Sequence, residues 1–342
     1  MLVGFLIIRS GESKSSQPPK HVRKSKTIYS PTEATSQAKK KNAAVSQVVQ
    51  NLATRANNNK MIYFTTTDCK VIEFEKHSSK FGANVVSCSY KNGQGIIVFD
   101  APVVRIGDDS FENCENLKSI EIPNGVTSIG EAAFFGCDKL ESVIIPKGVI
   151  SIGESAFCDC KKLTSVKIPS SVTSIGRAAF HGCNNLAKIT IPNSVTSIGK
   201  SAFAHCWSLK EITIPNSITS LGIMTFDQCC NITSVTISNS IASIGLLTFN
   251  NCYSLESIII PENVASIDEY AFFNCKKLMN VYCKRSTPPT GKSNMFLAYR
   301  EEGSKEYCPI NCQIYVPRNS VEAYKSAEGW KEYADRIVGY DF

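Results

Sequence analysis

Eight cysteines recur at one constant interval of twenty-three positions, and this interval constrains the fold more than any other feature of the chain. A phenylalanine lies three residues before each of them, and an aliphatic residue lies three residues after. The eight are Cys114, Cys137, Cys160, Cys183, Cys206, Cys229, Cys252 and Cys275. Self-similarity at a fixed period in this range is the signature of stacked repeats. A residue that recurs in every repeat serves the stack, which argues against a functional interpretation of these cysteines.

Each repeat places two apolar residues around one variable residue, and proline usually follows, as in Ile120, Ile122 and Pro123. A period of two with β-branched side chains predicts a short strand with one buried face. The proline marks the end of strand pairing. A second aliphatic pair and a glycine such as Gly130 come next, and the glycine is expected to turn the chain with a positive φ. The Ala-Phe-x-x-Cys stretch predicts a single helical or 3₁₀ turn.

One unit cannot bury both of its apolar edges, so neighbouring units stack and bury them together. Neighbouring strands lie ~4.7–4.9 Å apart, so eight coils would span roughly 40 Å and carry one continuous sheet along a face. The predicted fold class is therefore a repeat solenoid, mainly β, with short helical or 3₁₀ turns.

The unit L-x-x-I-x-I-P-x-x-V-x-x-I-G-x-x-A-F-x-x-C-x-x-L runs from Leu117 to Leu140 and resembles the BspA-type leucine-rich repeat. That repeat occurs in surface proteins of anaerobic bacteria and some protozoan parasites. The resemblance covers roughly residues 95–284. It implies a right-handed leucine-rich-repeat stack and a role in adhesion. Common leucine-rich repeats carry Asn or Cys just after the strand, whereas proline stands there in this chain, so their ligand rules transfer poorly.

Residues 1–60 form a separate segment by composition, with eleven Lys or Arg against two Glu, a net charge of +9. The rest of the chain carries 26 basic and 28 acidic side chains. Ser, Gln, Asn and Lys dominate the segment, which predicts a disordered tail or linker. A solvated linker is the simpler interpretation, and contact with nucleic acid or an anionic surface is the alternative. No array of aromatic and basic residues supports a nucleic-acid module, so no nucleic-acid partner is expected.

Two segments are expected to cap the solenoid, because terminal coils would otherwise expose core. Residues 61–95 predict a β cap, with strands at 61–67 and 70–74, and the repeats occupy 96–284. Residues 285–342 predict a C-terminal cap. There the strand-plus-proline phrase at 314–317 follows Val281 and Cys283 by one repeat period plus ten positions, so the last coil is expanded. A helix is expected from about Ser320, a good N-cap residue. Its apolar side would hold Val321, Tyr324, Trp330, Tyr333 and Ile337, unless Gly329 interrupts it.

Fifteen cysteines suggest disulfides or metal sites. The eight periodic ones are expected to be reduced thiols in the core, where free cysteine behaves as a small apolar residue. Cys158 and Cys230 each neighbour a periodic cysteine by chance. The two pairs for which a disulfide is considered are Cys69 with Cys88 and Cys308 with Cys312. The second pair is alternatively half of a metal site.

Catalytic signatures are missing from the sequence. No P-loop, G-x-S-x-G or H-E-x-x-H motif occurs, and the repeat register predicts no nucleophile within reach of a base. His181 and His205 follow their phenylalanines at different offsets, so they are variable turn residues. The sequence therefore predicts no enzyme and no catalytic, cofactor-binding or metal-binding residue.

The variable residue of each strand is expected to point outward and form a ladder along the sheet. These residues are Glu121, Ile144, Lys167, Thr190, Thr213, Thr236, Ile259 and Tyr282. Solenoids use such extended faces for partners, so this ladder is the predicted site for a protein or glycan macromolecule. The expanded last coil, with Tyr299, Arg300 and Tyr307, is a second candidate site.

The predicted function is non-catalytic binding by a surface-displayed or secreted monomer, with an intracellular scaffold as the alternative. The surface assignment rests on the family resemblance. The apolar start Met1-Leu-Val-Gly-Phe-Leu-Ile-Ile, followed by Arg9, has only fragments of a secretory signal. No stretch reaches ~18 apolar residues, so no transmembrane span is expected.

Overall fold

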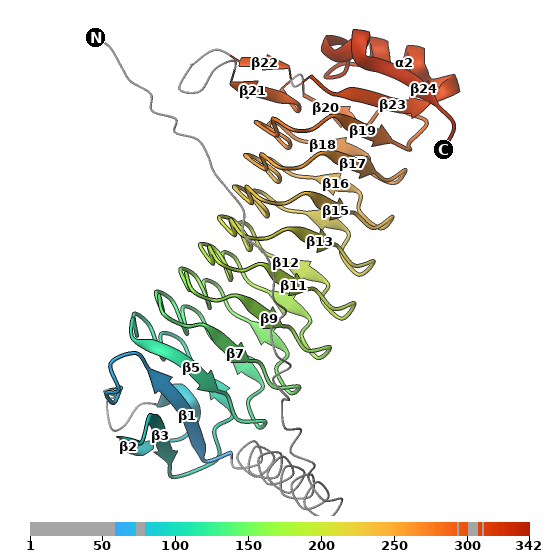
Figure 1. The fold of residues 1–342 in the computed structure, drawn as a ribbon. Helices are drawn as coiled ribbons and strands as arrows, with labels where there is room; N and C mark the ends of the chain where they lie inside the picture. Colours follow the sequence, from blue (N-terminus) through green and yellow to red (C-terminus); the bar gives the residue numbers. More distant parts are fainter. Residues whose placement is uncertain (1–58, 73–78, 293, 300–306, 310) are drawn as a thin grey trace, which may run out of the picture. The chain divides into compact units, whose positions relative to one another are not determined.

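The computed structural model describes residues 59–72, 79–292, 294–299, 307–309 and 311–342. The basic segment, apart from its last two residues, lies outside these ranges, and so does His77. The described chain winds into stacked coils, each contributing one strand to each of two parallel ladders (Figure 1). This architecture confirms the predicted mainly β repeat solenoid.

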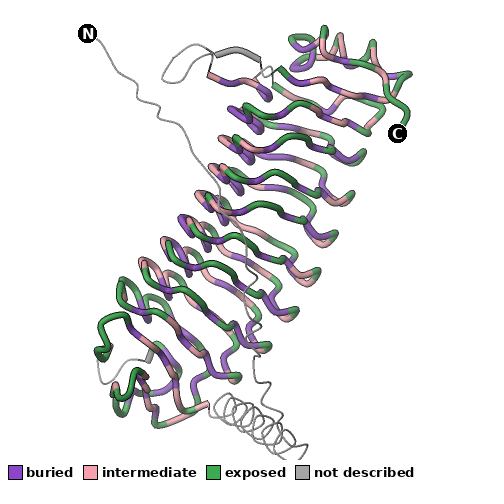
Figure 2. The backbone as a smooth tube through the Cα atoms, viewed as in Figure 1, coloured by how far each residue is buried: buried purple, intermediate pink, exposed green. Residues whose placement is uncertain are grey.

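The first ladder consists of short parallel strands that follow one another at the repeat interval. They are β5 (Leu117–Glu121), β7 (Ser142–Ile144), β9 (Ser165–Lys167), β11 (Lys188–Thr190), β13 (Glu211–Thr213), β15 (Ser234–Thr236), β17 (Ser257–Ile260) and β19 (Asn280–Cys283). Their burial alternates, with the middle residue of each three-residue strand buried and its neighbours exposed (Figure 2). The exposed side of these strands and of the strands that extend them at both ends is called the outer face below.

The second ladder is formed by two-residue strands on another side of each coil. They are β4 (Arg105–Ile106), β6 (Ser128–Ile129), β8 (Ser151–Ile152), β10 (Ser174–Ile175), β12 (Ser197–Ile198), β14 (Ser220–Leu221), β16 (Ser243–Ile244), β18 (Ser266–Ile267) and β20 (Thr290–Gly291). Most neighbouring strands pair in parallel with serine beside serine, as at Ser128 and Ser151.

The ladders are not continuous, in contrast to the single sheet that the sequence predicted. Within the described residues, strand pairing stops between β11 and β13 and, at the same junction, between β12 and β14. The first ladder also divides between β15 and β17, where the second continues. The double break coincides with a change in the repeat, since the small Ala202 of one coil is followed one period later by the larger, fully buried Thr225. Strands of two or three residues have few hydrogen bonds to lose, so a small local change is enough to interrupt them.

A third edge of the coil, between the second ladder and the next strand of the first, holds the coils together by backbone hydrogen bonds. Phe134 N donates to Ala156 O at 2.8 Å, and Phe203 N donates to Thr225 O at 3.0 Å, so this turn edge is intact at the junction where both ladders break. The aromatic rings behind it stack nearly parallel, and the separation of ring centroids grows from 5.1 Å at Phe111–Phe134 to 5.6 Å at Phe180–Phe203.

The repeat glycines do not adopt the positive φ that the sequence predicted. The left-handed residues lie two positions later, as at Ser155 (φ 51°), and directly before each periodic cysteine, as at Asp159 (φ 57°). The glycines serve close approach instead. A Cβ on Gly153 would lie 2.5 Å from the carbonyl carbon of Gly130 in the preceding coil. Asp268 fits this position in the last repeat without a left-handed backbone.

The N-terminal cap places an antiparallel strand against the first coil. β1 (Met61–Thr66) lies between β5 and β3 (Gln94–Phe99), and β2 (Val85–Lys91) pairs with the other edge of β3. A short 3₁₀ turn, η1 (Ser79–Phe81), precedes β2. The repeats were predicted to begin at residue 96, but β1 separates the strand of Ile97 and Phe99 from β5.

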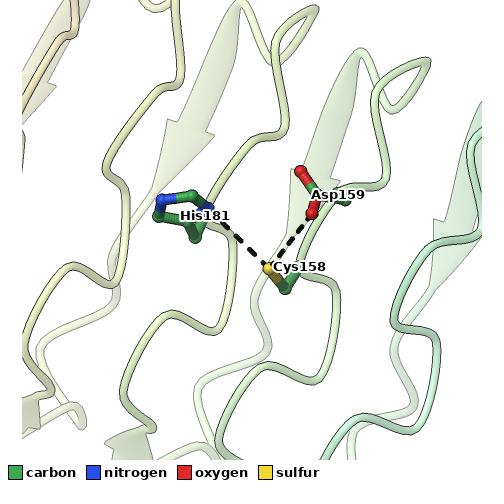
Figure 3. Close-up of side chains that lie close together, drawn as sticks. All are labelled: Cys158, Asp159 and His181. Atoms are coloured by element: carbon green, nitrogen blue, oxygen red, sulfur yellow. Dashed lines mark hydrogen bonds between the residues drawn. The ribbon is translucent and has the colours of Figure 1, made fainter.

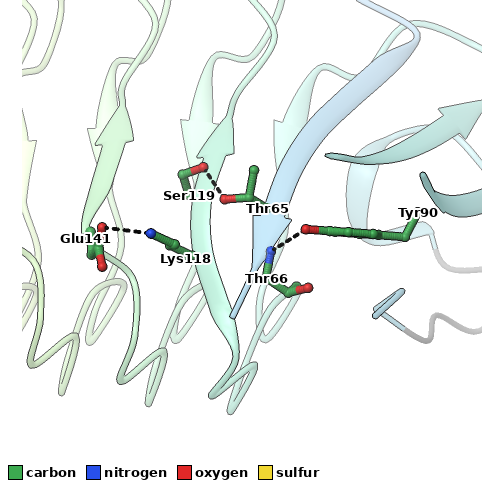
Figure 4. A network of polar contacts seen from close by, with 6 residues as sticks. All are labelled: Thr65, Thr66, Tyr90, Lys118, Ser119 and Glu141. Atoms are coloured by element: carbon green, nitrogen blue, oxygen red, sulfur yellow. Dashed lines mark hydrogen bonds and ion pairs between the residues drawn. The ribbon is translucent and has the colours of Figure 1, made fainter. Parts of the chain in front are cut away.

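Side-chain contacts fix this cap onto the stack (Figure 4). The hydroxyls of Thr65 and Ser119 lie 2.7 Å apart across the β1–β5 pair, and Thr66 N donates to Tyr90 Oη at 3.4 Å. Residues 70–72 do not form the predicted strand, and residues 73–74 lie outside the described ranges. The hydroxyl of Thr66 bonds both the N–H and the C=O of Lys70, which closes a local turn there.

The C-terminal cap continues the first ladder by two strands. β23 (Gln313–Pro317) pairs with β19, and β24 (Ile337–Tyr340) pairs with β23, all in parallel. The expanded coil contributes a hairpin of β21 (Leu297–Tyr299) and β22 (Tyr307–Pro309). The predicted helix is short and interrupted: η2 (Arg318–Ser320), α2 (Val321–Ser326) and η3 (Lys331–Arg336) precede β24. Gly329 adopts φ 81° between α2 and η3, and Ile337 begins a strand instead of continuing the helix.

Buried aromatic residues anchor this cap to the expanded coil. Tyr324, Trp330 and Tyr333 are almost completely buried, as their predicted place on an apolar side requires. Trp330 Nε1 donates to Pro289 O at 2.8 Å, and Tyr324 Oη donates to Arg285 O at 2.9 Å. Ser320 stands at the N-cap of α2 but makes no capping hydrogen bond with its side chain.

Candidate functional site

The eight residues predicted to form the binding ladder all lie on the outer face. The strand register pairs them two by two: Glu121 with Ile144, Lys167 with Thr190, Thr213 with Thr236, and Ile259 with Tyr282. Ile144 and Ile259 expose 70% and 50% of their surface, while Glu121 and Tyr282 are half-buried. The remaining members are exposed, and they are Lys167, Thr190, Thr213 and Thr236.

An aromatic cluster lies where β19, β23 and β24 adjoin. The rings of Tyr282 and Tyr315 stack with centroids 4.7 Å apart and planes inclined by 11°. The ring of Tyr340 meets both edge-on, at 5.6 Å and 5.5 Å, and Phe342 packs on Tyr340. Tyr340 and Phe342 remain exposed. This tyrosine cluster is a continuous aromatic surface next to the exposed Ile259.

Sequence reasoning found only Tyr282 of this cluster. Tyr315 occupies the same variable position in the strand-plus-proline phrase, so the repeat register contained the signal. Tyr340 could not be found in this way, because residues 320–337 were expected to be helical and β24 was not predicted.

A groove lies beside Ile144, near the other end of the outer face. It has a volume of about 600 Å³ and is lined by Val143, Ile144, Ile145, Pro146, Lys147, Gly148, Asn124, Lys167 and Pro169. Six coil steps separate β7 from β19, so the groove and the tyrosine cluster lie roughly 29 Å apart. Thr190, Thr213 and Thr236 of the binding ladder lie between them.

The second predicted site, in the expanded coil, is only partly described. Tyr299 pairs with Tyr307 in the hairpin, and its ring packs edge-on against Phe273 at 5.2 Å. Arg300 and the side chain of Tyr307 lie outside the described residues.

The repeat cysteines form a hydrogen-bonded ladder inside the stack. Each thiol from Cys137 onward donates to the carbonyl oxygen of the phenylalanine 26 residues earlier, at 3.1–3.4 Å. Burial raises the pKa of the Cys114 thiol to about 11, and it also raises the pKa values of Cys137 and Cys160 well above the ordinary value. Since the thiolate is the reactive form, these thiols are poor nucleophiles.

The disulfides considered from the sequence are not present among the described cysteines. Cys69 and Cys88 are both free. Cys312 is free and buried, which removes the pairing with Cys308, whose side chain lies outside the described residues.

The turn edge brings together three residues that sequence reasoning set aside. Cys158 Sγ lies 3.8 Å from Asp159 Oδ2 and 3.8 Å from His181 Nδ1 (Figure 3). The Cys158 sulfur, a carboxylate oxygen of Asp159 and a ring nitrogen of His181 all lie within 4.8 Å of one another, and all three are atoms that can bind a metal ion. Cys158 had been assigned to chance and His181 to a variable turn, but the two occupy the same position in consecutive repeats.

With this geometry established, comparison with known proteins identifies the repeat. The profile of the BspA type leucine rich repeat region matches residues 79–206 and 173–296, in six copies. The chain therefore belongs to the BspA-type leucine-rich-repeat family, which confirms the resemblance. This repeat family suggests a role in protein interaction or adhesion. No curated protein matches the chain.

Solved structures with similar coils include a leucine-rich repeat protein of T. pallidum, with 31% identity over 46% of this chain and 73% of that one, and a TM-score of 0.43. A leucine-rich repeat protein from Bacteroides ovatus is 18% identical over 80% of this chain and 98% of its own, with a TM-score of 0.32. A leucine rich cell surface protein from Faecalibacterium prausnitzii is 21% identical over 75% and 90%, with a TM-score of 0.25. In the described part of the chain, no helix has the length and apolar character needed to span a bilayer.

Proposed function

We propose that this chain is a non-catalytic binding protein that holds a macromolecular partner on its outer face. The observation that carries the proposal is the tyrosine cluster, which adds a continuous exposed aromatic surface to a ladder of hydroxyl side chains. Tyrosine is enriched at binding surfaces because it combines a large rigid ring with a polar end. Contiguous exposed apolar area is uncommon on a protein without a partner.

The partner is a protein or a glycan, and its contact would run from the tyrosine cluster toward the groove at Ile144. Threonine hydroxyls between the two offer donors and acceptors without a strong charge. Leucine-rich repeats bind proteins through extended faces of this kind, which favours a protein over a glycan.

The family resemblance favours display on the cell surface or secretion. An intracellular scaffold is the second candidate, and one observation supports it. The described cysteines are free thiols, as in proteins of reducing compartments.

A binding screen tests the outer face. Full-length protein would be screened on a glycan array and against separated surface proteins of the cells that the source organism contacts. The double variant Tyr282→Ala/Tyr315→Ala should weaken binding of any ligand found by tenfold or more. Trp207→Ala is the matched control, because Trp207 is an exposed aromatic residue on the turn edge. A ligand held equally well by the double variant would contradict the proposal, because the tyrosine cluster would then not be the site.

Protease shaving of intact source cells tests the location. Release of peptides from residues 105–284, without cytoplasmic markers, is expected for a displayed protein. Digestion only after lysis would exclude display and leave the scaffold.

A further inference from the structure

Two adjacent positions of the turn edge, directly after the repeat phenylalanine, collect metal-binding side chains in consecutive coils. In the first position Cys158 is followed by His181 one period later, and in the second Asp159 is followed by His205 two periods later. At the equivalent positions of most other coils stand Phe, Gly, Ala, Asn or Gln. His181, one of the four histidines of the chain, therefore meets a cysteine that does not belong to the periodic ladder, and the ring of His205 lies beside that of His181.

The distances suit a tetrahedral metal ion. Zinc bonds of about 2.3 Å to sulfur and 2.0–2.1 Å to nitrogen or oxygen place neighbouring ligand atoms about 3.3–3.6 Å apart. Cys158 Sγ already lies 3.8 Å from both Asp159 Oδ2 and His181 Nδ1. Contraction by a few tenths of an ångström would bring these two pairs to ligand distance. Asp159 Oδ and His181 Nδ1 lie within 4.8 Å and need a larger adjustment, which rotation of two half-buried side chains supplies.

His205, one coil beyond His181, offers a further imidazole beside this cluster. Its ring centroid lies 4.8 Å from that of His181, with the ring planes inclined by 49°. Two imidazoles on one tetrahedral zinc have ring centroids about 5 Å apart, given the same bond lengths. Behind the histidines, the buried carboxylate of Asp227 accepts a hydrogen bond from Asn250 Nδ2 at 2.7 Å and is thereby fixed in place.

The surroundings set which protons the four side chains hold before a metal ion binds. Burial and the neighbouring His205 lower the pKa of His181, so its imidazole is neutral and has a lone pair available near pH 7. Burial, and then Asp159, raise the pKa of Cys158 to about 12, so a metal ion has to displace the thiol proton in order to bind the sulfur. The carboxylate of Asp159 fits beside the next coil only because Gly182 has no side chain. A Cβ on Gly182 would lie 2.2 Å from Asp159 Oδ1.

We propose that Cys158, Asp159, His181 and His205 bind one zinc ion on the turn edge. On binding, the thiol of Cys158 releases its proton to solvent and its sulfur bonds the metal as thiolate. The ion would link three consecutive coils along the turn edge, which lies outside both strand ladders. This site is independent of the outer face and of any partner bound there.

Titration with Co²⁺, which adopts the same geometry and is coloured, tests the site. Full-length protein without a histidine tag, stripped of metal by a chelator, should bind one Co²⁺ with a thiolate-to-cobalt charge-transfer band that Zn²⁺ abolishes. Cys158→Ala should remove the band, and His181→Ala and His205→Ala should each weaken binding by at least the roughly 10–100-fold that the loss of an outer-shell partner causes. Affinity should rise with pH, since a thiol proton is lost.

Cys69→Ala serves as the matched control, because it removes an exposed free thiol far from the cluster in sequence and should leave the band unchanged. Circular dichroism would verify that each variant keeps the fold. Absence of a charge-transfer band in the folded wild type would overturn the proposal, as would a band that persists in Cys158→Ala. Unchanged affinity in His205→Ala would remove His205 from the ligand set.

Discussion

The thiol of Cys137 donates a hydrogen bond of 3.1 Å to the carbonyl oxygen of Phe111 in the preceding coil. The same carbonyl oxygen accepts a backbone hydrogen bond from Cys114 N, in its own coil, at 3.2 Å. The contact explains why cysteine recurs at this position, since alanine would leave space there and valine could not donate. Because the thiol bonds from one coil to the next, the cysteine ladder contributes to stacking as well as to the core.

Cys137→Ala should therefore lower the free energy of unfolding by about 1–2 kcal/mol, through the lost sulfur contacts and the lost hydrogen bond to the Phe111 carbonyl. Urea denaturation followed by circular dichroism measures this change. Cys69 is exposed and serves as the control. Its replacement by alanine should change the free energy of unfolding by about 0.5 kcal/mol or less. Equal effects of the two substitutions would contradict a stacking role for the ladder.

Raised thiol pKa values predict that alkaline pH destabilises the fold. Cys114 has a pKa of about 11 in the folded chain. An unfolded cysteine has a pKa of about 8.5, so above pH 8.5 the folded state binds more protons. The protonated thiol of Cys114 makes its full contribution to the free energy of unfolding below about pH 8.5. This contribution is lost as the pH rises through 11. Denaturation midpoints should fall steadily between pH 8 and pH 9.5. A midpoint that is constant over this interval would argue that the thiols are accessible.

Two repeat glycines provide a test of close coil approach. A Cβ on Gly176 would lie 2.5 Å from the carbonyl carbon of Gly153, whereas on Gly222 its nearest neighbour would be 3.6 Å away. Gly176→Ala should destabilise the protein by about 1–3 kcal/mol, because backbone cannot move aside without separating the coils. Gly222→Ala should be neutral or stabilise by up to about 1 kcal/mol, since it restricts only the unfolded chain. Similar losses in both variants would show that these glycines serve another purpose.

Hydrogen exchange should detect the interruption of both ladders. The amide of Gly199 donates to Ile175 O and that of Gly245 to Leu221 O, each at 2.9 Å, but Gly222 has no counterpart among the described hydrogen bonds. Peptides covering 211–222 should exchange faster than the equivalent peptides 188–199 and 234–245. Equal protection in all three would mean that the ladder is closed in solution.

Much of the fold could be predicted from the sequence, because the Phe-x-x-Cys interval and the alternating Ile pairs each report a local preference repeated many times. The eight outward residues followed from the same alternation. What could not be predicted depends on contacts between segments remote in sequence. β1 was recognised as a strand, but its insertion between β3 and β5 could not be inferred from spacing. Similarly, β24 follows directly on a 3₁₀ turn whose apolar pattern resembles a helix.

The proximity of Cys158 to His181 shows a different limit. Repeat arithmetic places both at one position of consecutive coils, so their adjacency was implicit in the register. Treating every off-ladder cysteine and histidine as a variable residue removed that signal. The positions with positive φ were missed for a related reason. Asn, Asp and Gly before the periodic cysteines mark the left-handed site. The positive φ was instead predicted at the repeat glycine, such as Gly130, because that glycine recurs more regularly.

The junction between the β11–β12 coil and the β13–β14 coil also has a mechanical consequence. Its coils remain joined along the turn edge by bonds such as Phe203 N to Thr225 O, at 3.0 Å, but not along either ladder. A load applied along the stacking axis would meet its lowest resistance there. The sheet side would yield first while the turn edge acts as a pivot, so the stack should respond to tension as two stiff segments joined by one compliant link.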